Sequence, residues 1–202
     1  MNAGHQSGRS AETVHSSKTL AQFLTLLFSR SSAELVDLGP VVGANITFLG
    51  ERIGCKIHVE DLYADLDRHA GQDALDRFPE FLERRLALLD QSVDAVLCWD
   101  IFDYLAPAAA HVLAGELIRV LRPGGALLGF FSSGGLDAGC YTKYVIEDEA
   151  HLRCRFYAAA CGRGTVLQNR DITNLFAGLE LFASVLLKSG VREVLFRKPD
   201  EA

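Results

Sequence analysis

A glycine-bounded turn follows the first apolar run that reads as a strand. Residues 34–46 read Glu-Leu-Val-Asp-Leu-Gly-Pro-Val-Val-Gly-Ala-Asn-Ile, with the turn bounded by Gly39 and Gly43. Such a strand–turn–helix unit suits nucleotide-like ligands, because helix N–H groups point at the ligand and glycine lets the backbone approach it. The pattern predicts a ligand-binding turn, with Val41 at a position where another glycine would be expected.

Acidic residues follow the next two apolar runs as well. Residues 56–60 read Lys-Ile-His-Val-Glu, which alternates as a strand does, and they end in Glu60 next to Asp61. For an acidic pair directly after an apolar strand, a ligand-binding role and a solvated strand end are about equally favoured. Residues 93–99 read Val-Asp-Ala-Val-Leu-Cys-Trp and lead into Asp100.

The elements that must position these residues alternate between strands and helices. The order strand, helix, strand, helix, strand predicts a parallel sheet covered on both faces. Arg122-Pro-Gly-Gly125 is expected to end the last of these helices, which Pro107 opens. Strands are expected from Glu34 onward and at 56–60, 93–99 and 126–131, and helical patterns at 20–28, 45–54 (with Asn45 as a candidate N-cap), 62–91 and 108–121.

The C-terminal third has a different pattern. Residues 143–146 and 152–157 predict a hairpin, and the runs 179–187 and 191–197 predict a tight antiparallel pair joined by Lys188-Ser-Gly190. We therefore expect a mainly parallel α/β sheet with a C-terminal antiparallel hairpin. One domain is expected over residues 17–202, preceded by a mobile polar leader at 1–16.

Composition narrows the functional classes. The chain has 202 residues with a formal net charge of −6 and shows no basic stripe, which argues against nucleic acid as a partner. Its five cysteines include no Cys-x-x-Cys pair, which favours a reducing cytoplasm without structural disulfides or a metal site. The apolar stretch 20–28 is too short to span a bilayer, and no basic amphipathic helix points to a membrane surface.

Taken in order, these parts resemble the class I S-adenosylmethionine-dependent methyltransferase family. The resemblance rests on the Asp37-x-Gly39 turn, the acid that ends the second strand, the Asp94-Ala-Val-Leu-Cys-Trp-Asp100 segment, Leu-Arg-Pro-Gly-Gly at 121–125 and the final hairpin. It covers roughly residues 30–198. It implies a Rossmann-like three-layer fold and S-adenosylmethionine as cofactor. Its departures are Val41 and the lack of a clear strand between residues 62 and 91.

The resemblance also implies roles for particular residues. The ribose diol needs a carboxylate with two acceptor oxygens, which Glu60 or its neighbour Asp61 supplies. The cationic amino group of the methionine part suits Asp37, and Gly39 admits the ligand. The remaining residues expected to contact the cofactor are Pro40, Gly43, Cys98 and Trp99.

Methyl transfer needs a general base only when the acceptor is protonated at working pH. The candidates are Asp100, Asp103 and Tyr104, and for the two aspartates a structural role in the following turn is about equally favoured. We expect a small-molecule acceptor, and the sequence leaves a homodimer open.

Two other classes compete with this hypothesis. Val41 and the missing strand motivate a non-catalytic methyltransferase-like protein that acts in binding or assembly. Thermal stabilisation by S-adenosylmethionine distinguishes the two. A nicotinamide-dependent oxidoreductase would need Gly-x-Gly-x-x-Gly in the first turn, and the sequence lacks it.

Overall fold

The main sheet has six strands in the order β3-β2-β4-β5-β9-β8. The computed structural model describes residues 12–134, 139–164 and 166–200. Strands β3, β2, β4 and β5 are parallel, whereas β9 pairs antiparallel with both β5 and β8. The expected fold class is confirmed. The strand bounds are β2 (Glu34–Asp37), β3 (Lys56–Val59), β4 (Val93–Trp99), β5 (Leu121–Ser132), β8 (Glu180–Leu186) and β9 (Val191–Arg197).

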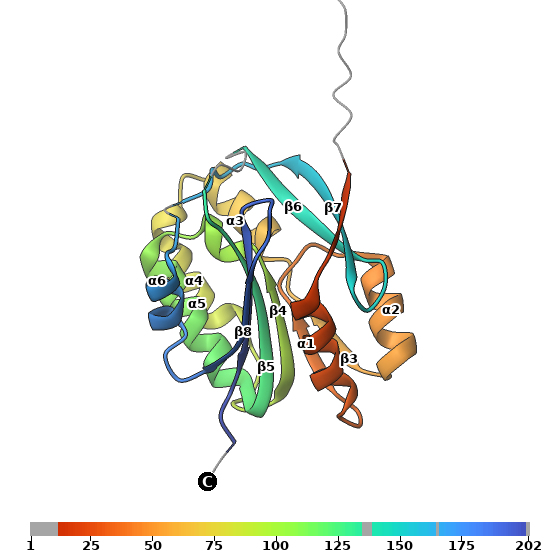
Figure 1. Ribbon diagram of the computed structural model, residues 1–202. Helices are drawn as coiled ribbons and strands as arrows, with labels where there is room; N and C mark the ends of the chain where they lie inside the picture. Colours follow the sequence, from red (N-terminus) through yellow and green to blue (C-terminus); the bar gives the residue numbers. More distant parts are fainter. Residues whose placement is uncertain (1–11, 135–138, 165, 201–202) are drawn as a thin grey trace, which may run out of the picture.

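Helices cover both faces of this sheet, and each face has its own apolar core (Figure 1). One core is formed with α1 (Lys18–Phe28) and α2 (Gly43–Ile53). The helices of the other core are α3 (Leu62–Gly71), α4 (Phe78–Arg85), α5 (Pro107–Val120) and α6 (Asn169–Leu175). All seven residues of β4 are buried between the two cores, which explains the continuous apolar pattern of that segment.

A second sheet of three strands, in the order β1-β7-β6, lies near α2 (Figure 1). It consists of β1 (Thr13–Ser16), β6 (Cys140–Ile146) and β7 (His151–Ala158), all antiparallel. The predicted hairpin is therefore present, but it pairs with the N-terminal strand rather than with the main sheet. The expectation of a mobile leader is wrong for Thr13–Ser16, because these residues pair with β7. Residues 1–11 lie outside the described residues.

Several local boundaries differ from the expectation. The helical pattern at 62–91 contains α3, a short 3-10 helix η1 (Leu75–Arg77) and α4, because the chain turns after Gly71. Among the described residues, no strand lies between β3 and β4, so β3 is an edge of the sheet. Strand β5 already begins at Leu121, within the segment that was expected only to end the helix.

The role of Asn45 also differs from the expectation. Helix α2 begins at Gly43 with Val42 as its N-cap, so the predicted capping role of Asn45 is wrong. The Asn45 side chain instead binds strand β6: its Nδ2 donates to the Tyr144 carbonyl at 3.0 Å, and its Oδ1 accepts from the Ile146 N–H at 2.8 Å. Both sides of one amide are used. Asn45 therefore ties the start of α2 to the three-stranded sheet.

Asp94 has a structural role where the parallel strands of the main sheet begin. Its carboxylate accepts from Arg30 at 3.0 Å, from Arg122 at 2.7 Å and from the Glu34 N–H at 2.9 Å. These contacts join the starts of β2, β4 and β5. They account for the acidic residue of the 94–100 segment and the arginine of the 121–125 segment without any ligand.

Candidate functional site

Strands β2 and β3 end side by side in acidic residues. Asp37 is the last residue of β2 and is buried, while Glu60 follows β3 directly. The Glu60 N–H donates to the Asp37 carbonyl at 2.8 Å. Because these strands are parallel, their carboxyl ends lie side by side at one end of the sheet. Ligands bind at this end of the sheet in this architecture. The structure therefore brings together two of the residues that the sequence predicted for one ligand.

The turn after β2 takes an ordinary backbone path. The Gly39 N–H donates to Asp37 Oδ1 at 2.9 Å, and the chain then runs through Pro40 to the first residue of α2, Gly43. Val41 is 61% exposed, and its φ is not positive. A β-branched residue resists only the left-handed region, so valine fits this turn without strain. The space around Gly43 is open.

The end of β4 lies against this turn through Trp99. The indole Nε1 donates to Asp37 Oδ1 at 2.6 Å. The ring also stacks on Tyr144 of β6, with centroids 5.2 Å apart and planes 7° from parallel. Trp99 is 3% exposed. Its φ is +50°, a left-handed conformation that is uncommon for a bulky side chain.

The second acidic position is also engaged within the chain. Glu60 pairs with Arg85 of α4, and the Arg85 Nε donates to Asp65 of α3 at 2.6 Å. Asp61 is the N-cap of α3, because its side chain accepts from the Ala64 N–H at 3.0 Å. Asp61 is therefore used in capping α3. Of the two neighbouring carboxylates, Glu60 is the one that does not cap a helix.

Burial raises the pKa values of two groups near these strand ends, Asp37 and Cys98. The pKa of Asp37 rises to about 6 because burial disfavours the carboxylate, and the hydrogen bonds from Gly39 and Trp99 oppose that effect. Cys98 of β4 is fully buried beside Asp37, and burial raises the pKa of its thiol well above the usual value. Cys98 is therefore a neutral packing residue in this structure.

The three predicted catalytic candidates meet at one arginine. Arg163, in the loop after β7, donates to Asp100 Oδ2 at 3.1 Å and pairs with Asp103. Its guanidinium carbon lies 4.7 Å from the centroid of the Tyr104 ring. Tyr63 of α3 donates to Asp100 Oδ1 at 2.6 Å. Two carboxylates and one guanidinium are thus buried together.

The pKa values of both aspartates are raised. That of Asp103 rises to about 7, first because of burial and then because of the nearby charge of Asp100, while Arg163 opposes the rise. Burial likewise raises the pKa of Asp100. The two Asp103 oxygens accept from the Ser132 N–H at 3.1 and 3.0 Å. Tyr104 donates to the Cys140 carbonyl at 2.7 Å, and burial raises the pKa of its phenol, so it stays protonated.

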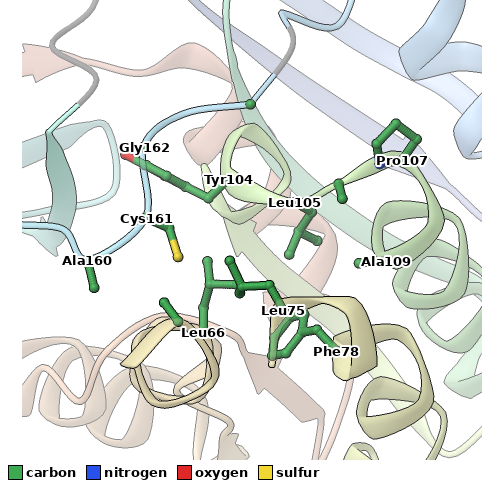
Figure 2. Close-up of a pocket in the computed structure, with 13 residues that line it drawn as sticks. Leu66, Leu75, Phe78, Tyr104, Leu105, Pro107, Ala109, Ala160, Cys161 and Gly162 are labelled. Carbon is green, nitrogen blue, oxygen red and sulfur yellow. The ribbon is translucent and has the colours of Figure 1, made fainter. Parts of the chain in front are cut away.

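A cavity of about 510 Å³ borders this cluster (Figure 2). Tyr104 forms part of its wall, and the Cys161 thiol points into it. The other lining residues are mostly apolar and come from α3, η1, the start of α4, the start of α5 and the loop after β7: Leu66, Ala70, Leu75, Phe78, Leu105, Ala106, Pro107, Ala109, Ala160, Gly162 and Gly164.

Three residues of the site were not found from the sequence. Arg163 lies between two glycines in Cys161-Gly-Arg-Gly164, a pattern that could have marked a loop arginine with a special position. Arg85 and Tyr63 reach the site from other elements, and no local pattern distinguishes them from surface or core residues. Within the described ranges, no group of three His, Cys, Asp or Glu side chains is arranged to hold a metal ion.

Residues 36–129 match the family model described as a methyltransferase domain. With the mainly parallel sheet and the acidic strand ends, this match supports the predicted resemblance to class I S-adenosylmethionine-dependent methyltransferases, whose cofactor is S-adenosylmethionine. No curated protein matches the sequence. None of the described helices is long and apolar enough to cross a bilayer.

Solved structures share this fold at low sequence identity. One is the 1,6-didemethyltoxoflavin-N1-methyltransferase of Burkholderia thailandensis with bound 1,6-didemethyltoxoflavin and S-adenosylhomocysteine (TM-score 0.57, 17% identity, 91% of this chain and 78% of the other). Another is a putative sarcosine dimethylglycine methyltransferase of Galdieria sulphuraria (0.55, 16%, 91% and 85%). A third is described as a cyclase (0.52, 13%, 90% and 82%). These likenesses concern the fold.

The chemistry of the strand ends fits the cofactor, whereas the space is closed. Asp37 and Glu60 are acceptors of the kind that an ammonium group and a ribose diol need. A Cβ atom built on Gly39 would lie 2.6 Å from Trp99 Cδ1, so the indole packs directly on the glycine backbone. The donor set is therefore suitable, and Trp99 occupies the space beside Gly39.

Proposed function

We propose that this protein transfers the methyl group of S-adenosylmethionine to a small-molecule acceptor. The observation that carries the proposal is the pairing of Asp37 and Glu60 at the ends of adjacent parallel strands, next to the Gly39 turn, within the segment that matches a methyltransferase domain. The small-molecule part is supported by the bordering cavity of about 510 Å³, a size typical of small-ligand pockets.

In this proposal, the residues at the sheet edge hold the cofactor. Asp37 pairs with its ammonium group, Glu60 accepts from the ribose hydroxyls, and Gly39 lets the backbone approach. Bound there, the cofactor supplies an electrophilic methyl group on a sulfonium. The protein then mainly aligns the acceptor, because the reactivity comes from the cofactor itself.

The neighbouring cluster would serve the acceptor. Tyr104 belongs both to the cavity wall and to the contacts of Arg163, so an acceptor in the cavity would lie next to the buried carboxylates. Asp103, with a pKa near 7, has the value that suits a general base at neutral pH. Its oxygens are occupied by Arg163 and the Ser132 amide, so this role requires that Arg163 release it.

Glu60→Ala tests the proposal directly. We expect the affinity for S-adenosylhomocysteine, measured by calorimetry, to fall at least about tenfold, because a buried hydroxyl pair loses its acceptor. Glu51→Ala is the matched control, since Glu51 is an exposed acid on α2. Unchanged affinity in Glu60→Ala would remove the ribose contact from Glu60. Absence of binding by the unmodified protein at millimolar ligand would contradict the proposal as a whole.

The second candidate is a non-catalytic methyltransferase-like protein. Closure of the space beside Gly39 by Trp99 favours it, as does the engagement of Glu60 by Arg85. A protein of this kind would show no stabilisation by the cofactor or its product in thermal unfolding, whereas saturating ligand stabilises a binding protein by several kcal/mol at about 1,000 times its Kd.

A further inference from the structure

We infer that Trp99 is a movable plug in the cofactor site, and that its indole must leave Asp37 and Gly39 before the cofactor enters. The inference rests on the proposed function, because it concerns access to the same site. It goes further by assigning a defined closed state and one side chain that controls it.

The first argument is steric. A Cβ atom on Gly39 would lie 2.6 Å from Cδ1 and 2.7 Å from Nε1 of the indole, so the ring fills the place that the missing side chain leaves. A glycine in the turn lets a ligand approach the backbone only when the space beside its Cα is free. In this structure the Trp99 indole fills that space.

The second argument is electrostatic. The indole N–H donates to Asp37 Oδ1 at 2.6 Å, on the same carboxylate that suits the cofactor's ammonium group. An indole N–H is a neutral donor, whereas an ammonium group carries a full charge and makes the stronger hydrogen bond to a carboxylate. The ligand can therefore replace the indole at Asp37 with a better partner.

The third argument is conformational. Trp99 has a φ of +50°, a left-handed conformation that strains an L-residue. Two further contacts hold it there: the stack on Tyr144 at 5.2 Å and an edge contact with Phe130 at 5.8 Å. Because Tyr144 belongs to the three-stranded sheet, the plug is held between the glycine turn and that sheet. A strained residue held by a separate element is suited to a two-state change.

The chain offers a direct probe, because Trp99 is its only tryptophan. Intrinsic fluorescence of the full chain would be titrated with S-adenosylhomocysteine, and calorimetry under the same conditions would measure binding independently. We expect a saturable red shift and greater quenching by acrylamide as the indole leaves its buried stack. Both changes should follow the calorimetric binding curve.

Trp99→Phe provides the second test. Phenylalanine keeps an aromatic ring for Tyr144 but cannot donate to Asp37, so we expect S-adenosylhomocysteine to bind about tenfold more tightly than to the unmodified protein. Phe182 is an exposed aromatic residue on β8, so Phe182→Leu is the matched control and should leave the affinity for S-adenosylhomocysteine unchanged.

The outcomes separate this inference from the proposed function. Calorimetric binding with an unchanged Trp99 emission would overturn the plug while leaving the proposed function in place. Trp99→Phe binding no more tightly than the unmodified protein would do the same. Absence of binding by both proteins would overturn the proposed function together with the plug.

Discussion

The Asp37 carboxylate should destabilise the folded chain at neutral pH. Its pKa is about 6 in the folded protein, against an ordinary value of 3.8. Between these values the folded chain binds more protons than the unfolded chain, so the free energy of unfolding falls as the pH rises. The stability that protonated Asp37 allows is present at acid pH, declines above about 4 and is fully lost above about 6.

The magnitude follows from the two pKa values. Their difference corresponds to roughly 3 kcal/mol in total, of which about 2 kcal/mol is lost between about pH 4.5 and about pH 8. Asp37→Asn removes this dependence, because the amide does not ionise. Its oxygen can still accept from Gly39 and Trp99, which both bind Oδ1.

Urea unfolding followed by circular dichroism, at about pH 4.5 and about pH 8, measures the effect. The quantity of interest is the stability of Asp37→Asn minus that of the unmodified protein, compared between the two pH values. Any cost of burying the amide is the same at both and cancels. We expect the difference to rise by about 2 kcal/mol at the higher pH. Asp76→Asn, an exposed aspartate in η1, should show no change.

The same difference at both pH values would refute the reasoning, because it would mean that Asp37 ionises as readily in the folded chain as in the unfolded one. Loss of S-adenosylhomocysteine binding in Asp37→Asn would accompany the gain in stability at about pH 8. A carboxylate that costs stability and serves the ligand is a common compromise at functional sites.

Two other perturbations test contacts around the site. Asn45→Ala should lower the free energy of unfolding by about 2 kcal/mol and speed hydrogen exchange at the Ile146 amide, because it leaves that amide and the Tyr144 carbonyl without their partner; slow exchange in the variant would contradict this. Arg163→Met should lower the free energy of unfolding by about 3–5 kcal/mol at about pH 8, because it leaves two buried carboxylates without a cation. The cost should shrink below pH 7, where Asp103 takes up a proton, and equal losses of Tm at pH 8 and pH 5.5 would argue against the shared ion pair.

The sequence was most informative where one pattern determined one element. Strand β4 has the bounds that its apolar run predicted, because both of its faces are buried and every position except Asp94, which is paired with arginines, is apolar. The placement of Asp37 and Glu60 at one edge followed from the topology, since parallel strands end together.

Contacts between distant segments could not be predicted in this way. Trp99 lies 62 residues from Asp37, and no local signal indicates that its indole turns back onto the glycine turn. Arg163 reaches Asp100 across 63 residues, from a loop whose path depends on the second sheet. Asn45 looked like a helix cap because asparagine is common there, but tertiary hydrogen bonds to β6 determined its role.

The Asn45 amide has a consequence for engineering this protein. It bonds to a carbonyl and an N–H of β6, as one residue of a neighbouring strand would. These two hydrogen bonds hold the start of α2, and with it the glycine turn, against the three-stranded sheet. Exchanging the β6–β7 hairpin for one from another protein would therefore disturb the glycine turn unless the new hairpin offers a carbonyl and an N–H at the same register. A successful graft has to include residue 45 in its design.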